Sequence, residues 1–362
     1  MRQQLSAPGR AFTLDMEDEP EIPQLAQFGV LNDAIQFLNH EVARAYRAAD
    51  EAALQHQRHH RQLARWAIST GAAAVMLAIV QPALKSAPDS WRGFVVWLEL
   101  AAVVIGVIAV VFGLKAKFDS QWFIQRHVAE RLRMLKFRAL GRAELWCGNR
   151  AGWEDWVRGQ IAAILAITSI EQVKEWAAGG EAEPDEPQPP PCTLSAPVLR
   201  AYSIYYRWKR VEFQSAYFKK QAEEFRKQSK PVAHLGRPLF FLTITAGALH
   251  FFADWRAHVA ETAHAESTAH AWHAIGVWAL AAAALIPVGG LCVRAWTGAF
   301  EHARSASLFE AKRRALVTLS GQLDKDCGDL PKTMHHIAHI EHFLEHEHRE
   351  WLRLLLEAEW FL

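Results

Sequence analysis

Residues 97–118 read WLELAAVVIGVIAVVFGLKAKF, and Glu99 is the only charged side chain before Lys115. With its lead-in, the apolar run covers residues 94–114, which is 21 residues. As a helix it would extend about 31 Å, close to the hydrocarbon thickness of about 30 Å in a bilayer. The run stops at Lys115 and Lys117. The stretch therefore predicts a membrane span and raises the question of what a glutamate does in it.

Three further apolar runs occur at residues 66–84, 238–253 and 274–293. The run 238–253 is short for a span and would need flanking side chains to complete it. A soluble helical bundle that buries all four runs is the alternative, and the short run fits it best. Four such runs flanked by basic sequence favour the membrane. No strand-like alternation of any length appears, so we expect an all-α membrane protein with two tandem two-transmembrane helical hairpins and long cytosolic helices.

Basic residues gather on one side of the four runs. Only Lys85, Arg92 and Arg256 lie in the loops inside the two pairs. The positive-inside rule then places the N- and C-termini and the middle of the chain in the cytoplasm. Tryptophans near the opposite ends of the runs suit the outer interface. The basic residues outside the pairs are Arg58, Arg61, Arg65, Lys115, Lys117, Arg126, Lys227, Lys230, Arg237, Arg294 and Arg304.

The rest of the composition excludes several function classes. Net charge is +1, and the basic residues lie mostly at membrane edges, so we expect no nucleic-acid partner. No Walker, dinucleotide or GxSxG motif occurs, so we expect neither an enzyme nor a cofactor. The four cysteines form no CxxC pair, and we expect neither a disulfide framework nor a zinc site. The first residues lack the apolar core of a secretory signal.

The chain repeats its own order of elements. A shift of about 172 residues places the first run on the third, and a shift of 180 places the second on the fourth. We divide the chain into an N-terminal segment, partly disordered (1–33), a first two-span repeat (34–178), an acidic proline-rich linker (179–197) and a second two-span repeat (198–362). Outside the spans we expect helices at residues 34–65, 118–146, 153–178, 202–230 and 297–323, and a last helix from about 332.

Glu99 begins a stripe on one face of the second span. At helical spacing the stripe contains Glu99, Val103, Gly106, Val110 and Gly113. An ionisable residue in a span is a functional hypothesis, and glycines allow close helix approach, so we predict a pore-lining or helix-packing face. Glu99 also lies only about 8 Å from the outer edge, where it could reach headgroups and water instead. The second repeat has alanine there.

Histidines mark the last helix. His335, His339, His342 and His346 follow at i, i+4, i+7 and i+11 on one face. Imidazoles at i, i+4 can share a transition metal, but one helix supplies only two ligands per ion. We therefore predict no metal site, with these four histidines as weak candidates for ligands and a solvated polar face as the other interpretation. The outer loop histidines His258, His264, His270 and His273 have the same two interpretations.

The layout resembles that of SLATT domains, the SMODS and SLOG-associating two-transmembrane effectors of prokaryotic defence operons. Two tandem copies would cover residues 34–362. The likeness is carried by Arg126, Glu130 and Arg133 in the first copy and by Arg304, Glu310 and Arg313 in the second, where the arginine-to-glutamate spacing is six rather than four. The closing helix, with Trp351, Glu357 and Trp360, also fits.

The resemblance implies an oligomeric inner-membrane effector of anti-phage defence that forms a pore or disrupts the bilayer when triggered. It implies no catalytic residues, and its partners would be the lipid bilayer, further copies of the chain, and a separate sensor protein or nucleotide signal. The alternative is a non-conducting scaffold or regulatory membrane protein whose cytosolic helices recruit partners. A histidine-dependent metal transporter is a third hypothesis.

Overall fold

The computed structural model describes residues 28–84, 88–116, 118–179, 194–233, 236–300, 302–325 and 329–357. Nearly all of these residues are helical and none is in a strand, which confirms the all-α class. Most of the expected segment 1–33 and residues 180–193 of the expected linker lie outside this range, as do the side chains of Arg304, Glu357 and Trp360.

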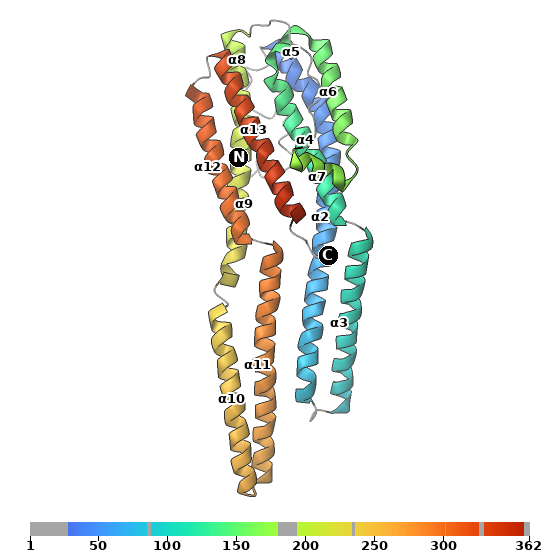
Figure 1. Cartoon of the computed structure of the whole chain (residues 1–362), viewed down its shortest axis with the longest axis vertical. Coiled ribbons are helices and arrows are strands. Elements are labelled where there is room, and N and C mark those ends of the chain that lie inside the picture. The colour runs from blue at the N-terminus through green and yellow to red at the C-terminus, as the bar shows by residue number, and fades with distance from the viewer. Residues whose placement is uncertain are drawn as a thin grey trace. The chain divides into compact units, whose positions relative to one another are not determined.

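The helices follow one another along the chain (Figure 1). The first part of the chain forms α2 (Gly29–Val80), the 3-10 turn η4 (Gln81–Leu84), α3 (Asp89–Ala116), α4 (Phe118–Gly141), α5 (Ala143–Gly148), α6 (Arg150–Leu165) and α7 (Ile170–Ala178). The second part forms α8 (Ala196–Tyr206), the π-helix η5 (Arg207–Glu212), α9 (Phe213–Ala233), α10 (Gly236–Thr262), α11 (Glu266–Phe300), α12 (His302–Lys325) and α13 (Leu330–Glu357).

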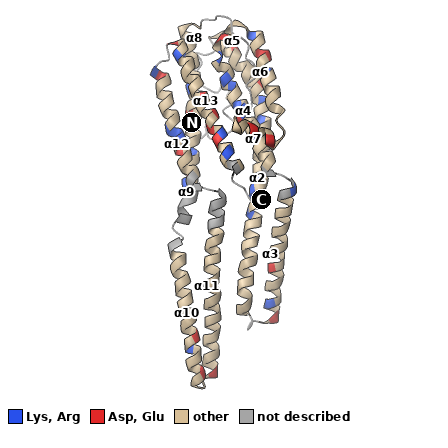
Figure 2. Ribbon diagram, in the orientation of Figure 1, with Lys and Arg blue, Asp and Glu red and all other residues tan. Residues whose placement is uncertain are grey.

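The chain folds into two compact units. The first, here called the bundle, contains residues 28–59, 118–222 and 307–357; the second, the apolar unit, contains residues 60–116 and 223–306. Lys, Arg, Asp and Glu are frequent on the helices of the bundle and sparse on α3, α10 and α11 (Figure 2). Each unit therefore contains segments from both halves of the chain. Helices α2, α9 and α12 each begin in one unit and end in the other.

Several helix boundaries differ from the expected ones; for example, the helix expected at 118–146 is divided into α4 and α5. The polar helix 34–65 and the run 66–84 form one helix, α2, since no proline interrupts them before Pro82. The segment 153–178, expected as one helix, is divided between α6 and α7. The division occurs because Ser169 caps the start of α7 through a capping box with Gln172. The helix expected from 202 begins at Ala196, with Pro197 in its first turn, and contains the π-helix η5.

One cysteine corrects a further expectation. Cys147, in α5, is disulfide-bonded, whereas Cys292 is free. The cysteine bonded to Cys147 lies outside the described residues. Sequence spacing shows no such pair because the approach of two Cα atoms, and not their separation along the chain, decides whether a bridge can form.

Three helices in the described residues are long and apolar enough to span a membrane: α2 together with η4, α3, and α11. The third predicted run, 238–253 within α10, is not among them, and Asp254 and Arg256 follow it directly. Large apolar side chains on these helices are exposed, for example Phe241 and Phe251 in α10 and Ile108 in α3. Such surface is typical of helices in contact with lipid or with further protein.

Small residues form the contacts inside the apolar unit. Helices α10 and α11 run side by side (Figure 1), and Ala253 and Ala257 of α10 are fully buried. Nδ1 of His250 lies 2.9 Å from the carbonyl oxygen of Gly276. Because a carbonyl oxygen can only accept, this nitrogen carries the hydrogen and donates the hydrogen bond. A Cβ placed on Gly276 would lie 3.6 Å from the Ala253 Cβ, and the two backbones are therefore close. Small residues are enriched at such interfaces in membranes.

Gly106 gives the first prediction. A Cβ on this residue would lie 2.9 Å from Oγ1 of Thr70, which donates a 2.7 Å hydrogen bond to the Trp66 carbonyl. We expect Gly106→Leu to separate α2 from α3 and to lower the melting temperature in detergent. Gly71→Leu is the control, since a Cβ there meets nothing within 4 Å. Equal melting temperatures for the two variants would contradict the close packing at Gly106.

Candidate functional site

The predicted face of α3 is directed toward α2. The Glu99 carboxylate accepts a hydrogen bond from Nε2 of Gln81, the residue with which η4 begins. A carboxylate in an apolar environment is costly unless it is hydrogen-bonded, and the amide of Gln81 supplies that bond. Gly106 faces Thr70, and Gly113 lies near Leu63. Glu99 and the two glycines therefore occupy positions for helix packing within this pair.

Val103, by contrast, is not on this contact face. Its side chain is 44% exposed, while those of Ala102 and Ala109 are buried, with exposures of 9% and 6%. The contact stripe therefore runs at i, i+3, i+7, i+10 and i+14 from Glu99 and includes Ala102 and Ala109. Because a helix has 3.6 residues per turn, i+3 and i+4 are both neighbours of i, and only the position of the partner helix selects between them.

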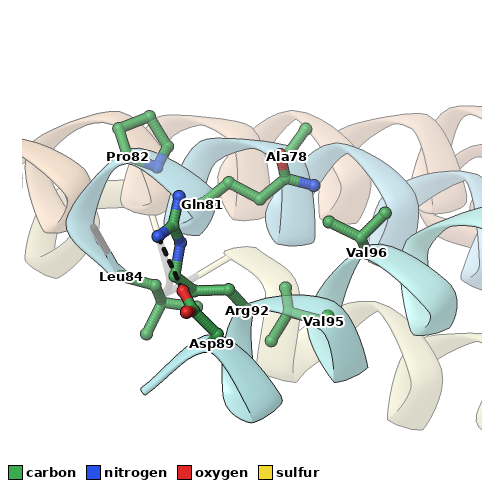
Figure 3. A pocket seen from close by; sticks show the side chains of 9 residues that line it. Ala78, Gln81, Pro82, Leu84, Asp89, Arg92, Val95 and Val96 are labelled. Carbon is green, nitrogen blue, oxygen red and sulfur yellow. Dashed lines mark hydrogen bonds and ion pairs between the residues drawn. The ribbon is translucent and has the colours of Figure 1, made fainter. Parts of the chain in front are cut away.

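A cavity of about 470 Å³ lies beside the turn that joins α2 to α3 (Figure 3). Arg92 donates a 3.1 Å hydrogen bond to Asp89 at its rim, and Gln81 also lines it. The other lining residues are mainly apolar: Ala78, Pro82, Leu84, Gly93, Val95 and Val96. Gln81 thus contributes both to this cavity and to the hydrogen bond with Glu99.

In the bundle, the motif residues of α4 form one ion-pair network. Arg126 contacts Asp50 of α2 at 3.0 Å and also pairs with Glu130, one turn further along α4. Arg133 lies 3.1 Å from Glu130 and donates a 3.1 Å hydrogen bond to the Tyr46 hydroxyl of α2. The i, i+4 spacing of Arg126 and Glu130 allows this pairing on one helix face. The network joins α4 to α2.

The network determines the charge of Glu130. Burial alone would raise the pKa of this carboxyl, but the guanidinium groups of Arg126 and Arg133 lower it to about 2. The same carboxylate raises the pKa of Arg133 against the effect of burial. On Lys312 of α12 burial is the larger effect and lowers the pKa to about 8, while Glu130 raises it. All three members of the α4 motif are therefore charged at neutral pH.

The second copy of the motif is arranged differently. Glu310 and Arg313 pair with each other on α12 at 2.9 Å and connect to no other helix among the described residues. The buried cation of α12 is Lys312, which pairs with Glu347 of α13. The two copies are therefore not equivalent, and Arg304 cannot be compared because its side chain is outside the described residues.

Two buried pairs were not predicted from the sequence. Arg210, in η5, donates two 2.8 Å hydrogen bonds to Glu341 of α13, and these side chains are only 4% and 6% exposed. The Tyr206 hydroxyl donates a third bond of 2.8 Å to the same carboxylate. The sequence carries a weak signal for this pair, since Glu341 falls on the apolar face of α13 between Ile337 and Leu344.

The second unpredicted pair is His127 of α4 and His348 of α13. Their rings are nearly parallel, and Nδ1 of His127 lies 3.2 Å from Nε2 of His348. Trp176 of α7 packs against both rings. Burial lowers the pKa of His348 to about 3, and burial together with His348 lowers that of His127. The imidazoles are therefore neutral at pH 7, and one donates a hydrogen bond to the other.

The four candidate metal ligands of α13 lie on its exposed side. His335, His339, His342 and His346 are solvent-accessible, whereas Ile337, Ile340 and Leu344 of the same helix are buried. In the described part of the chain no three His, Cys, Asp or Glu side chains gather closely enough to hold a metal ion. Near the turn between α10 and α11, Nε2 of His273 lies 2.9 Å from the Glu261 carboxylate.

No protein-family model, curated protein or solved structure matches this chain.

Glu130 gives the second prediction. Glu130→Gln leaves the buried Arg133 and the partly buried Arg126 without the carboxylate that they share. Breaking a buried pair typically costs about 3–5 kcal/mol. We expect a loss of this size in the unfolding free energy, measured by denaturant titration in detergent. The matched control is Glu310→Gln, whose carboxylate pairs with arginines of its own helix and joins no second helix in the described part of the chain, so stability should change little. If both variants lose the same stability, the α4 network does not hold the bundle together.

His348 gives the third prediction. Its pKa is about 3 in the folded chain and 6.5 for an unperturbed imidazole. Between these values the unfolded state binds more protons, so stability should fall as the pH is lowered from 6.5, by up to about 1.4 kcal/mol per pH unit for each such histidine. His348→Phe should reduce this slope between pH 6.5 and 5, and His335→Gln, an exposed control, should not. An unchanged slope in His348→Phe would contradict the neutral pair.

Proposed function

We propose that this chain is a membrane effector of prokaryotic anti-phage defence, which oligomerises to form a pore or to disrupt the inner membrane when triggered. It would cross the membrane with two tandem helical hairpins, α2/α3 and α10/α11, and both termini would lie in the cytoplasm. The observation that carries the proposal is the contrast between the two units. One exposes large apolar side chains along its helices, and the other carries charged groups outside and paired charges inside.

Charge placement supports this topology. The segments that join α2 to α3 and α10 to α11 are poor in Lys and Arg. By contrast, the apolar part of α2 is preceded by Arg58, Arg61 and Arg65. Helix α10 would complete the second pair even though its apolar run is short. It packs along α11, and its backbone groups are satisfied within the helix, as a bilayer requires.

The bundle would receive the signal. Its helices come from both repeats, and the α4 network and the pair Arg210–Glu341 hold α2, α4, η5 and α13 in register. A sensor protein or a nucleotide signal that displaced one of these helices would act on α2, which continues into the apolar unit. The resemblance to SLATT domains supports this role, with assembly of several copies as the response.

A non-conducting scaffold is the second candidate, and the position of Glu99 favours it. Glu99 is bonded to Gln81 within the helix pair, so it does not present a free carboxylate to a pore in this conformation. For Glu99 to line a path, several copies would have to assemble with α3 rotated away from η4. If no such rearrangement occurs, the bundle would recruit partners at the membrane without conduction.

The test is ion flux, and it gives the fourth prediction. In liposomes and in cells with and without phage infection, we expect the protein to dissipate a potassium diffusion potential or the membrane potential. Glu99→Gln should change the preference for cations, since a carboxylate ring favours them. Glu51→Gln, an exposed substitution on α2 in the bundle, is the control. Membrane localisation without flux under every condition would favour the scaffold and refute the effector.

A further inference from the structure

The exposed side of α13 carries a continuous stripe of imidazoles that the proposed function does not use. His335, His339, His342 and His346 are all solvent-accessible, and the opposite side of the helix packs into the bundle core. The ring centroids of His335 and His339 are 6.5 Å apart. This side of the helix is therefore accessible to a ligand from solution along about three turns.

The four rings are available as ligands. In the described part of the chain, none of them takes part in a hydrogen bond or an ion pair. Two acidic residues close to His346 in the sequence are already paired: Glu345 lies 2.7 Å from Arg349, and Glu350 lies 2.8 Å from Arg353. The stripe thus offers nitrogen ligands without carboxylate oxygens.

This ligand set selects one class of cation. Imidazole nitrogen suits zinc, copper and nickel, whereas calcium and magnesium require oxygen ligands. The pairs His335/His339 and His342/His346 each have the i, i+4 spacing with which two histidines on one helix bind the same ion. Two such pairs follow each other without sharing a residue.

We propose that the imidazole stripe of α13 is a binding surface for two divalent transition-metal ions, each held by one i, i+4 pair of histidines. The remaining coordination positions of each ion are open to water. This is consistent with the absence of any three-ligand cluster among the described residues, since each site uses two protein ligands. Affinity should follow the general order for such ligands, with Cu²⁺ bound more tightly than Ni²⁺.

The experiment, which is also the fifth prediction, measures Ni²⁺ binding to the full-length protein in detergent, purified without a polyhistidine tag. His339→Gln with His342→Gln removes one ligand from each pair and leaves two histidines eleven residues apart, about 16 Å along the helix. We expect the affinity of the chain for each of the two Ni²⁺ ions to fall on the order of 10²-fold, because the second imidazole of a pair binds at high effective concentration.

The control variant is His40→Gln with His264→Gln, which removes two histidines that have no second histidine three or four residues away. It should bind as many ions on α13 as the wild type does. Unchanged Ni²⁺ binding in the α13 variant, or an equal loss in the control, would overturn the proposal. Electron paramagnetic resonance of Cu²⁺ on the wild type gives an independent readout: two nitrogen ligands per ion are expected, and one nitrogen per ion would refute paired sites.

Discussion

The structure depends on one constraint: polar groups on apolar helices must be satisfied within a helix or between neighbouring helices, because the apolar outer faces offer no partner. The constraint accounts for the direction of Glu99, whose carboxylate accepts from Gln81, and for that of Thr70, whose hydroxyl donates to the Trp66 carbonyl. It also accounts for His250, which donates to the Gly276 carbonyl. What remains on the outside is apolar, and this surface is the reason to place the unit in a bilayer.

The bundle solves the opposite problem, since it places charges in an interior. Each buried cation of the α4 network has an anion within contact distance, and Arg210 binds Glu341 through two hydrogen bonds. Pairs of this kind contribute little net stability compared with apolar packing, but an incorrect register would leave a charge unpaired at high cost. We therefore regard the pairs as the elements that fix which helices are neighbours. Breaking the Arg126–Asp50 pair would remove a contact of α2, the helix that continues into the apolar unit.

Some features of the candidate site follow from local pattern, and others do not. The Arg126–Glu130 pairing follows from i, i+4 spacing, and the exposure of the four α13 histidines follows from the apolar positions of the same helix. The spacing could not show that Arg133 reaches Tyr46 of α2 or that His127 meets His348, because these partners are 87 and 221 residues apart. The internal repeat also suggests an equivalence between Glu130 and Glu310 that the packing of the described residues does not maintain: the arginines paired with Glu130 reach α2, whereas those paired with Glu310 lie on α12 and reach no other helix.

The sequence by itself determined the helical class, the apolar runs that became α3 and α11, and the positions of the small residues on which helices approach. These features depend on composition and on a period of 3.6 residues, which are properties of a single segment. Only the tertiary structure decided that Ala102 rather than Val103 faces α2, that α2 is one helix, and that Lys312 rather than Arg313 is buried. The reason is physical: a residue's side of a helix is selected by the neighbour against which it packs, and that neighbour comes from elsewhere in the chain.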